Sequence, residues 1–171
     1  MRIAVLTISD AGARGERADS SGDAIVHWAT VRSYEVGARA LVPDEVGAIV
    51  STLTRWCDGG VEGETIDLAL TTGGTGLSPR DVTPEATRAV IEREAPGIAE
   101  RLRVLCLTTF PRAALSRGIA GTRKGTLIVN LPGSPNGVRD ALAALDAVVD
   151  HAVAILSGTV TDHQPHTGAP R

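Results

Sequence analysis

The sequence predicts a three-layer α/β domain, with a mostly parallel central sheet, helices on both faces and a short antiparallel hairpin element. Apolar runs bounded by turn residues alternate with stretches of helical period, which is typical of strands joined by crossover helices. A length of 171 residues suits one buried core. Hydrophobic residues form 43% of the chain but aromatic residues only 2%, so aliphatic side chains must fill that core.

The first half of the chain supplies three strands and two helices. We expect strands at residues 3–8, 34–42 and 66–72, and the last of these is apolar on both faces. A strand of that kind belongs in the middle of a parallel sheet, where helices cover both of its faces. Ser20-Ser21-Gly22 opens the first helix, and apolar residues at i, i+3, i+4 spacing predict the second over residues 46–57.

The second half begins with a strong helix start, in which Thr83 is the expected N-cap and Pro84 the first helical residue. A short helix is expected over residues 98–105. Residues 117–131 predict two strands joined as a hairpin, and one long helix is expected over residues 135–156.

Composition narrows the possible partners. The net charge of -3 leaves no surplus of basic residues to hold a nucleic-acid backbone, and the few aromatic residues stand far apart in sequence, so they are not expected to stack bases. No apolar stretch approaches the roughly 18–20 residues of a membrane span, and no signal-peptide region precedes the first strand. We therefore expect a cytoplasmic protein that binds neither nucleic acid nor membranes, with residues 1–158 as a single domain and residues 159–171 as a flexible tail.

Cysteine and histidine supply no recognisable catalytic pattern. Cys57 and Cys106 stand alone, which favours two buried thiols over a disulfide. None of the four histidines has the companions of a Ser-His-Asp or Cys-His arrangement, so no hydrolytic triad is expected.

The most unusual segment is the Gly-rich loop over residues 71–81 (TTGGTGLSPRD). It joins the buried strand to the well-capped helix, at the sheet edge where ligands of parallel sheets bind. Gly73, Gly74 and Gly76 allow a tight turn whose N–H groups converge, which suits phosphate oxygens. Further donors are the hydroxyls of Thr72, Thr75 and Ser78 and the guanidinium of Arg80.

Neither common nucleotide-binding loop fits this segment. The Rossmann pattern needs a glycine where Pro79 stands, and a P-loop needs Gly-Lys followed by Ser or Thr, which occurs nowhere in the chain. A second strand-to-helix turn, residues 130–135 (NLPGSP), has Ser134 as the expected N-cap and Pro135 at the first helical position. Two such turns would suit two phosphate-bearing groups, while a Gly-rich connector and simple helix capping are the alternatives.

Two acidic residues stand at the same predicted edge. Asp44 follows Pro43 at the end of the second strand, and Asp81 closes the Gly-rich loop. A single aspartate at a helix start is usually a cap. Beside a phosphate-binding loop the pair predicts a Mg²⁺ site, because Mg²⁺ binds through one or two carboxylates together with phosphate oxygens and water.

These segments together resemble a known family. Residues 71–87 (TTGGTGLSPRDVTPEAT), residues 130–135 (NLPGSP), Leu115-Ser116-Arg117 and Pro43-Asp44-Glu45 closely resemble the molybdopterin adenylyltransferases. That family comprises the MogA and MoaB type proteins and the G domains of gephyrin and its plant counterpart. The resemblance runs in order over about residues 3–157. It implies a usually trimeric α/β protein that joins molybdopterin to ATP with Mg²⁺ and releases pyrophosphate, ahead of hand-over to a molybdate-inserting partner protein.

The resemblance also implies roles for individual residues. Asp44 and Asp81 match two acids that adenylylation needs, and they are the expected metal ligands. The matched substrate-binding positions are Ser9, Asp10, Ser21, Gly22, Thr72, Gly73, Gly74, Thr75, Gly76, Ser78, Arg80, Ser116, Pro132, Gly133 and Ser134. The nucleophile would be the molybdopterin phosphate, which is already ionised at neutral pH, so no general base is required.

Other functions stay open at this point. A non-catalytic pterin-binding or scaffold member would keep the fold and the pocket without turnover, although the presence of both acids favours activity. A nucleotide pyrophosphatase of the competence-damage type is a further alternative, but its Gly-rich loop usually lacks the TGLSPRD form. A molybdate-inserting domain normally occurs within a longer chain.

Overall fold

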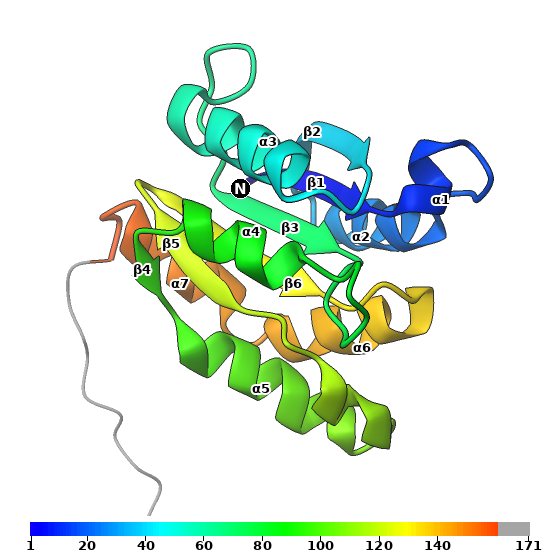
Figure 1. The fold of residues 1–171 in the computed structure, drawn as a ribbon. Helices are drawn as coiled ribbons and strands as arrows, with labels where there is room; N and C mark the ends of the chain where they lie inside the picture. The colour runs from blue at the N-terminus through cyan, green and yellow to red at the C-terminus, as the bar shows by residue number, and fades with distance from the viewer. Residues whose placement is uncertain (161–171) are drawn as a thin grey trace, which may run out of the picture.

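The computed structural model describes residues 1–160, which form one six-stranded sheet between two layers of helices (Figure 1). The strand order is β2-β1-β3-β6-β5-β4, with β2, β1, β3 and β6 parallel and β5 antiparallel to both of its neighbours. The predicted fold class is confirmed. The elements are β1 (Arg2–Ile8), α1 (Asp10–Ala13), α2 (Ser20–Val31), β2 (Glu35–Val42), α3 (Val46–Gly59), β3 (Leu68–Thr72), α4 (Thr83–Val90), β4 (Arg93–Glu94), α5 (Pro96–Leu107), the 3₁₀ helix η1 (Pro111–Leu115), β5 (Ala120–Arg123), β6 (Thr126–Leu131), α6 (Pro135–Leu145) and α7 (Val149–Leu156).

Strand β3 is central, as its apolar run predicts. It pairs in parallel with β1 on one side and β6 on the other, and all five of its residues are buried. The loop that follows β3 therefore lies between the loops that follow β1 and β6, because parallel neighbours end at the same edge.

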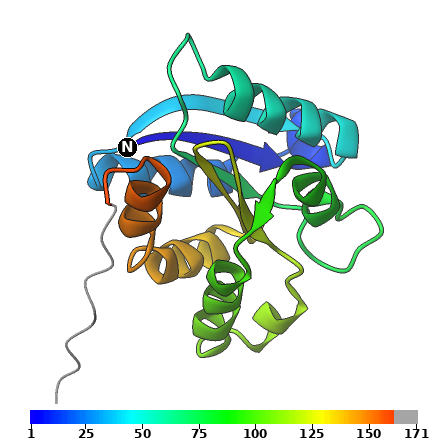
Figure 2. The same cartoon turned by 90° about the vertical axis from the view of Figure 1, so that its left-hand side faces the viewer.

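Alternate strand residues fill two separate cores. Ile3 and Val5 of β1 pack with residues of α2, α5, α6 and α7, whereas Ala4 and Leu6 pack with residues of α3 and α4. Figure 2 shows the sheet between these two groups of helices. Aliphatic side chains dominate both cores, and the free cysteines Cys57 and Cys106 are buried, as predicted.

Two helix predictions need correction. The hydroxyl of Thr83 does not cap α4, because the residue already lies inside the helix and donates to the carbonyl oxygen of Gly73 at 2.8 Å. The single helix expected over residues 135–156 is two helices, α6 and α7, separated by a turn at residues 146–148. Periodicity missed the break because apolar residues of both helices pack into the same core. At the break, the Asp146 carboxylate accepts the indole N–H of Trp28 at 2.8 Å.

Three short elements were not predicted, namely α1, β4 and η1. The expected hairpin is present: β5 and β6 pair antiparallel, and Lys124 in their turn has a φ of 49°. The predicted tail falls largely on residues 161–171, which lie outside the described part of the chain.

The loops that carry the predicted chemistry gather at one edge of the sheet. In Figure 1 the α1 region, the loop after β3 and the start of α6 all lie toward the right, where β1, β3 and β6 end. Within residues 1–160, no helix is long and apolar enough to cross a membrane.

Candidate functional site

Two glycine-bearing turns meet at this edge. The hydroxyl of Thr72, at the end of β3, donates to the carbonyl oxygen of Pro132 at 2.6 Å. A Cβ atom added to Gly133 would lie 3.1 Å from the Cα of Gly73, so the two turns are in backbone contact. The loop after β3 and the loop after β6 therefore form one continuous surface.

The shape of the first turn depends on two left-handed glycines. Gly73 has a φ of 99° and Gly74 a φ of 62°, a region that residues with a Cβ rarely adopt. Thr83 holds both glycines in place. Its N–H donates to the carbonyl oxygen of Gly74 at 3.1 Å, and its buried hydroxyl donates to the carbonyl oxygen of Gly73 at 2.8 Å. The first turn of α4 thus fixes the backbone of the Gly-rich loop.

This arrangement leaves main-chain donors without protein acceptors. The N–H groups of Gly74, Thr75 and Gly76 donate to no other group within residues 1–160. Thr75 is nevertheless 7% exposed, and a buried N–H without an acceptor is costly. At the second turn, Ser134 caps α6 by accepting the N–H of Gly137 at 3.2 Å, as predicted. Both turns can therefore present N–H groups to an anion.

A cavity of about 600 Å³ opens beside both turns. It has a largely apolar wall from α5, η1 and α6. Of the residues predicted to bind substrate or metal, those that line the cavity are Gly74, Thr75, Gly76, Asp81, Ser116, Pro132, Gly133 and Ser134.

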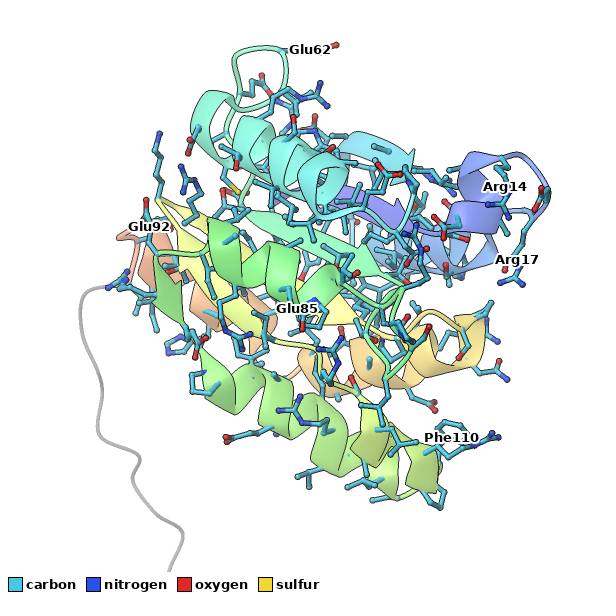
Figure 3. The ribbon with its side chains drawn as sticks, in the orientation of Figure 1. Arg14, Arg17, Glu62, Glu85, Glu92 and Phe110 are labelled. Atoms are coloured by element: carbon cyan, nitrogen blue, oxygen red, sulfur yellow. The ribbon has the colours of Figure 1, made fainter. Side chains whose placement is uncertain are left out.

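The far wall of the cavity was not predicted from the sequence. Its apolar members include Leu102 and Cys106 of α5 and Phe110 beside η1, and its charged members are Arg103 of α5, Arg112 of η1 and Asp140 of α6. Figure 3 shows Phe110 projecting beside η1 at the same edge of the molecule. Residues 104–115 did offer a signal in the sequence. They contain more apolar residues than the buried face of an amphipathic helix holds, and several of them are exposed in the structure.

The predicted acids lie around the Gly-rich turn, and Asp10 joins them. The N–H of Asp10 donates to the Asp44 carboxylate at 2.8 Å, and the N–H of Asp44 donates to the Asp10 carboxylate at 3.0 Å. Arg80 donates to both oxygens of Asp10, at 3.0 and 2.8 Å. Asp81 takes no part in these contacts, and its Oδ2 accepts the N–H of Ser78 within the same loop at 2.8 Å.

These contacts give the acids different proton affinities. Burial raises the pKa of Asp44 above its ordinary value, and the negative charges of Asp10 and Asp81 raise it further. By contrast, the hydrogen bonds from Arg80 lower the pKa of Asp10. Of these two carboxylates, Asp44 is therefore the one whose negative charge the protein itself offsets less.

Asp44 and Asp81 each keep one carboxylate oxygen that could bind a metal ion together with ligand oxygens. Asp44 Oδ1 and Asp81 Oδ1 accept no hydrogen bond from residues 1–160, and the two charges repel each other. Within that part of the chain, no three His, Cys, Asp or Glu side chains are grouped as a metal site. Such a partial ligand set suits Mg²⁺, which commonly takes one or two carboxylates and substrate phosphates.

The remaining predicted residues lie at the same edge but outside the cavity wall. Ser9 caps α1 by accepting the N–H of Gly12 at 3.1 Å. Ser21 and Gly22 are buried in the first turn of α2, where Asp19 accepts the N–H of Gly22 at 2.9 Å. A Cβ on Gly22 would lie 2.2 Å from that carboxylate, which is a structural reason for glycine there.

Comparison with known proteins agrees with the family resemblance of the sequence motifs. Residues 4–151 match the protein family described as a probable molybdopterin binding domain. The chain is 35% identical to the molybdopterin adenylyltransferase of Escherichia coli strain K12, over 99% of this chain and 92% of that protein. It is 38% identical to the molybdenum cofactor synthesis protein cinnamon of Drosophila melanogaster over 92% of this chain, which spans only 26% of that longer protein.

Solved structures show the same relationship. The crystal structure of the molybdopterin biosynthesis enzyme MoaB from Thermus thermophilus has a TM-score of 0.85 and 51% identity. The alignment covers 92% of this chain and 96% of that one, so the similarity extends over nearly the whole of both.

Proposed function

This chain belongs to the molybdopterin binding domain family, and from that premise we propose that it is an enzyme that transfers the adenylyl group of ATP to molybdopterin. The observation that carries the proposal is the backbone contact between the Gly73 and Gly133 turns beside one cavity. Two groups of free N–H donors, close together, suit a reaction between two phosphate-bearing molecules.

The reaction joins one phosphate to another. An oxygen of the molybdopterin phosphate attacks the α-phosphorus of ATP, the bond from that phosphorus to the β-phosphate bridging oxygen breaks, and pyrophosphate leaves with the electron pair. The attacking phosphate is already ionised, so this chain has no proton to remove. Its task is to hold two anions in line and to offset their charge.

The residues around the turn divide this task. The N–H groups of Gly74, Thr75 and Gly76 would bind phosphate oxygens. The guanidinium of Arg80 would release the Asp10 carboxylate and bind a phosphate in its place. The apolar cavity wall would bind the flat heterocycle of a substrate, since such rings favour concave apolar sites with a few polar groups.

Asp44 and Asp81 would hold Mg²⁺ through their free carboxylate oxygens. When bound, Mg²⁺ supplies positive charge that stabilises the phosphates during transfer. We further propose a cytoplasmic homotrimer that hands its product to a molybdate-inserting protein. The family resemblance supports these points, and sedimentation of the purified chain tests the trimer.

The decisive experiment mixes the purified protein with molybdopterin, ATP and Mg²⁺ and measures pyrophosphate. We expect pyrophosphate and adenylylated molybdopterin in equal amounts. Asp81→Asn should abolish this turnover but retain pterin binding, whereas Asp58→Asn should not, because Asp58 pairs with Arg123 at the opposite edge of the sheet. Pterin binding without pyrophosphate from the unaltered protein would instead identify a non-catalytic member of the family.

A further inference from the structure

Arg117 links four points around the Gly-rich loop. Its main-chain N–H donates to the carbonyl oxygen of Thr75 at 2.8 Å. Its guanidinium donates to the carbonyl oxygens of Gly76, at 2.7 Å, and Asp81, at 2.5 Å. The same guanidinium forms an ion pair with Glu85 in the first turn of α4. One residue, from the segment between η1 and β5, thus reaches both ends of the segment 76–81.

Few other contacts restrain that segment. Thr83 holds Gly73 and Gly74, which lie before it. Within the segment, Ser78 and Asp81 bond to each other through the Ser78 N–H and the Asp81 N–H. Those bonds give the segment its internal shape but do not place it against the rest of the protein. Apart from the Arg80 contact with Asp10, the hydrogen bonds that join it to the rest of residues 1–160 all involve Arg117.

We propose that Arg117 is a positioning residue, which fixes segment 76–81 so that the Asp81 carboxylate faces the cavity and Asp44. The inference rests on the adenylyl transfer proposed above. Arg117 acts on Asp81 through the main chain, because it binds the carbonyl oxygen and does not bind the carboxylate, whose Oδ1 accepts no hydrogen bond from residues 1–160. Glu85 keeps the guanidinium in place from α4, and Figure 3 shows Glu85 on that helix.

These contacts require an arginine at position 117, because another cationic side chain such as lysine could not make all of them at once. The planar guanidinium presents N–H groups in several fixed directions, so it can serve two carbonyl oxygens and a carboxylate at once. A lysine ammonium at the end of a flexible chain lacks that fixed fork. Arg117→Lys should therefore retain part of the restraint, and Arg117→Ala should lose the side-chain restraint entirely.

The first test follows hydrogen exchange of the ligand-free protein. In Arg117→Ala, we expect the hydrogen-bonded amides of the segment, those of Ser78, Arg80 and Asp81, to exchange about tenfold faster than in the unaltered protein, with Arg117→Lys in between. Arg123→Ala is the matched control, since Arg123 also donates to a carbonyl oxygen, that of Val90, and to a carboxylate, that of Asp58. It lies at the other end of β5 and should leave exchange in segment 76–81 unchanged.

The second test measures pyrophosphate release against Mg²⁺ concentration. Arg117→Ala should raise the concentration for half-maximal rate about tenfold, because a mobile Asp81 binds the ion less well. Excess Mg²⁺ should restore part of the rate, whereas Arg123→Ala should show the original Mg²⁺ dependence. If Arg117→Ala does not fold, both measurements are made on Arg117→Lys, for which smaller shifts in the same direction are expected.

The two tests separate this inference from the proposed function. Unchanged exchange in segment 76–81 would overturn the restraint whether or not the protein transfers adenylyl groups. Faster exchange with an unchanged Mg²⁺ dependence in an active enzyme would overturn the positioning of Asp81. If the unaltered protein releases no pyrophosphate, adenylyl transfer fails, and the exchange result alone decides whether Arg117 restrains the loop.

Discussion

Asp10 and Asp44 hold each other in place through paired hydrogen bonds, in which the N–H of each donates to the carboxylate of the other, at 2.8 and 3.0 Å. The two residues are 34 positions apart, and each follows a strand, β1 or β2. Their contact orients the Asp44 carboxylate toward the Gly-rich turn, where Asp44 Oδ1 would lie 2.9 Å from a Cβ on Gly74. The main-chain N–H groups of Asp10 and Asp44 thus position Asp44, the acid that we propose as a metal ligand.

We expect Asp44→Asn to lower adenylyl transfer by about 100-fold or more, because an uncharged amide binds Mg²⁺ poorly. Asparagine can still accept the Asp10 N–H, so the turn should keep its shape. Pyrophosphate release is the measurement, and Asp23→Asn is the control, since Asp23 is an exposed acid of α2 that pairs with Arg39. Equal losses in both variants would contradict a specific role for Asp44.

The same variant should change the pH dependence of stability. The pKa of Asp44 is raised in the folded protein, chiefly by burial, so ionising this carboxyl costs folding free energy. That cost is present above the folded-state pKa and disappears as the pH falls below the unfolded-state value. Asp44→Asn should therefore raise Tm by about 2 °C at neutral pH, and this gain should shrink in acid. Thermal unfolding at several pH values tests the sign, and a gain that grows in acid would contradict it.

Arg80 should contribute to ATP binding. Arg80→Ala is expected to raise the KM for ATP about tenfold, because a guanidinium that binds phosphate is lost. Arg88→Ala removes the same charge from an exposed ion pair with Glu94 and should leave the KM unchanged. Steady-state kinetics at fixed Mg²⁺ distinguishes the two variants. An unchanged KM in Arg80→Ala would mean that Arg80 serves only to hold Asp10.

The parts of the fold that the sequence predicts are those that local patterns determine. The double-sided apolar run of residues 66–72 predicts a central strand, and β3 is that strand. Ser134 is predicted as a cap from its place before Pro135, and it caps α6. The Gly-rich loop is recognisable because its glycines are close together in sequence.

The parts that escaped prediction depend on packing between distant segments. Arg117 and Glu85 are 32 residues apart, and their contact exists because the fold brings the segment before β5 and the first turn of α4 to the same edge of the sheet. The cavity wall from α5 and η1 depends similarly on how α5 packs against α6. Thr83 has the sequence of an N-cap, but its hydroxyl is drawn to the Gly73 carbonyl oxygen by the path of the preceding loop.

Replacing Gly74 with valine should disable the site, because the new side chain would displace the side chains around it. Its Cβ would lie 2.4 Å from Thr83 Oγ1 and 2.9 Å from Asp44 Oδ1, and the φ of 62° is unfavourable for a β-branched residue. We expect Gly74→Val to cost about 1–3 kcal/mol of stability and to weaken substrate binding. Gly47→Val is the control, because a Cβ at Gly47 meets nothing within 4 Å. Chemical denaturation and ligand titration measure both effects, and unchanged affinity in Gly74→Val would argue against the turn as a phosphate site.

The bond from Thr72 to Pro132 should matter for catalysis because it joins the two turns. Thr72→Val keeps the side-chain shape but removes the donor to the Pro132 carbonyl oxygen, at an expected cost of about 1–2 kcal/mol. Thr126→Val is a closely matched control: the hydroxyl of Thr126 is also buried and donates to a carbonyl oxygen 60 residues away, that of Ile66, at the opposite end of the sheet. Both variants should lose similar stability in denaturant titrations. Only Thr72→Val should also lower kcat, by about tenfold, while each substrate alone still binds, because the turns no longer align the two phosphates. Equal kcat values in the two variants would mean that the contact between the turns serves folding and not the reaction.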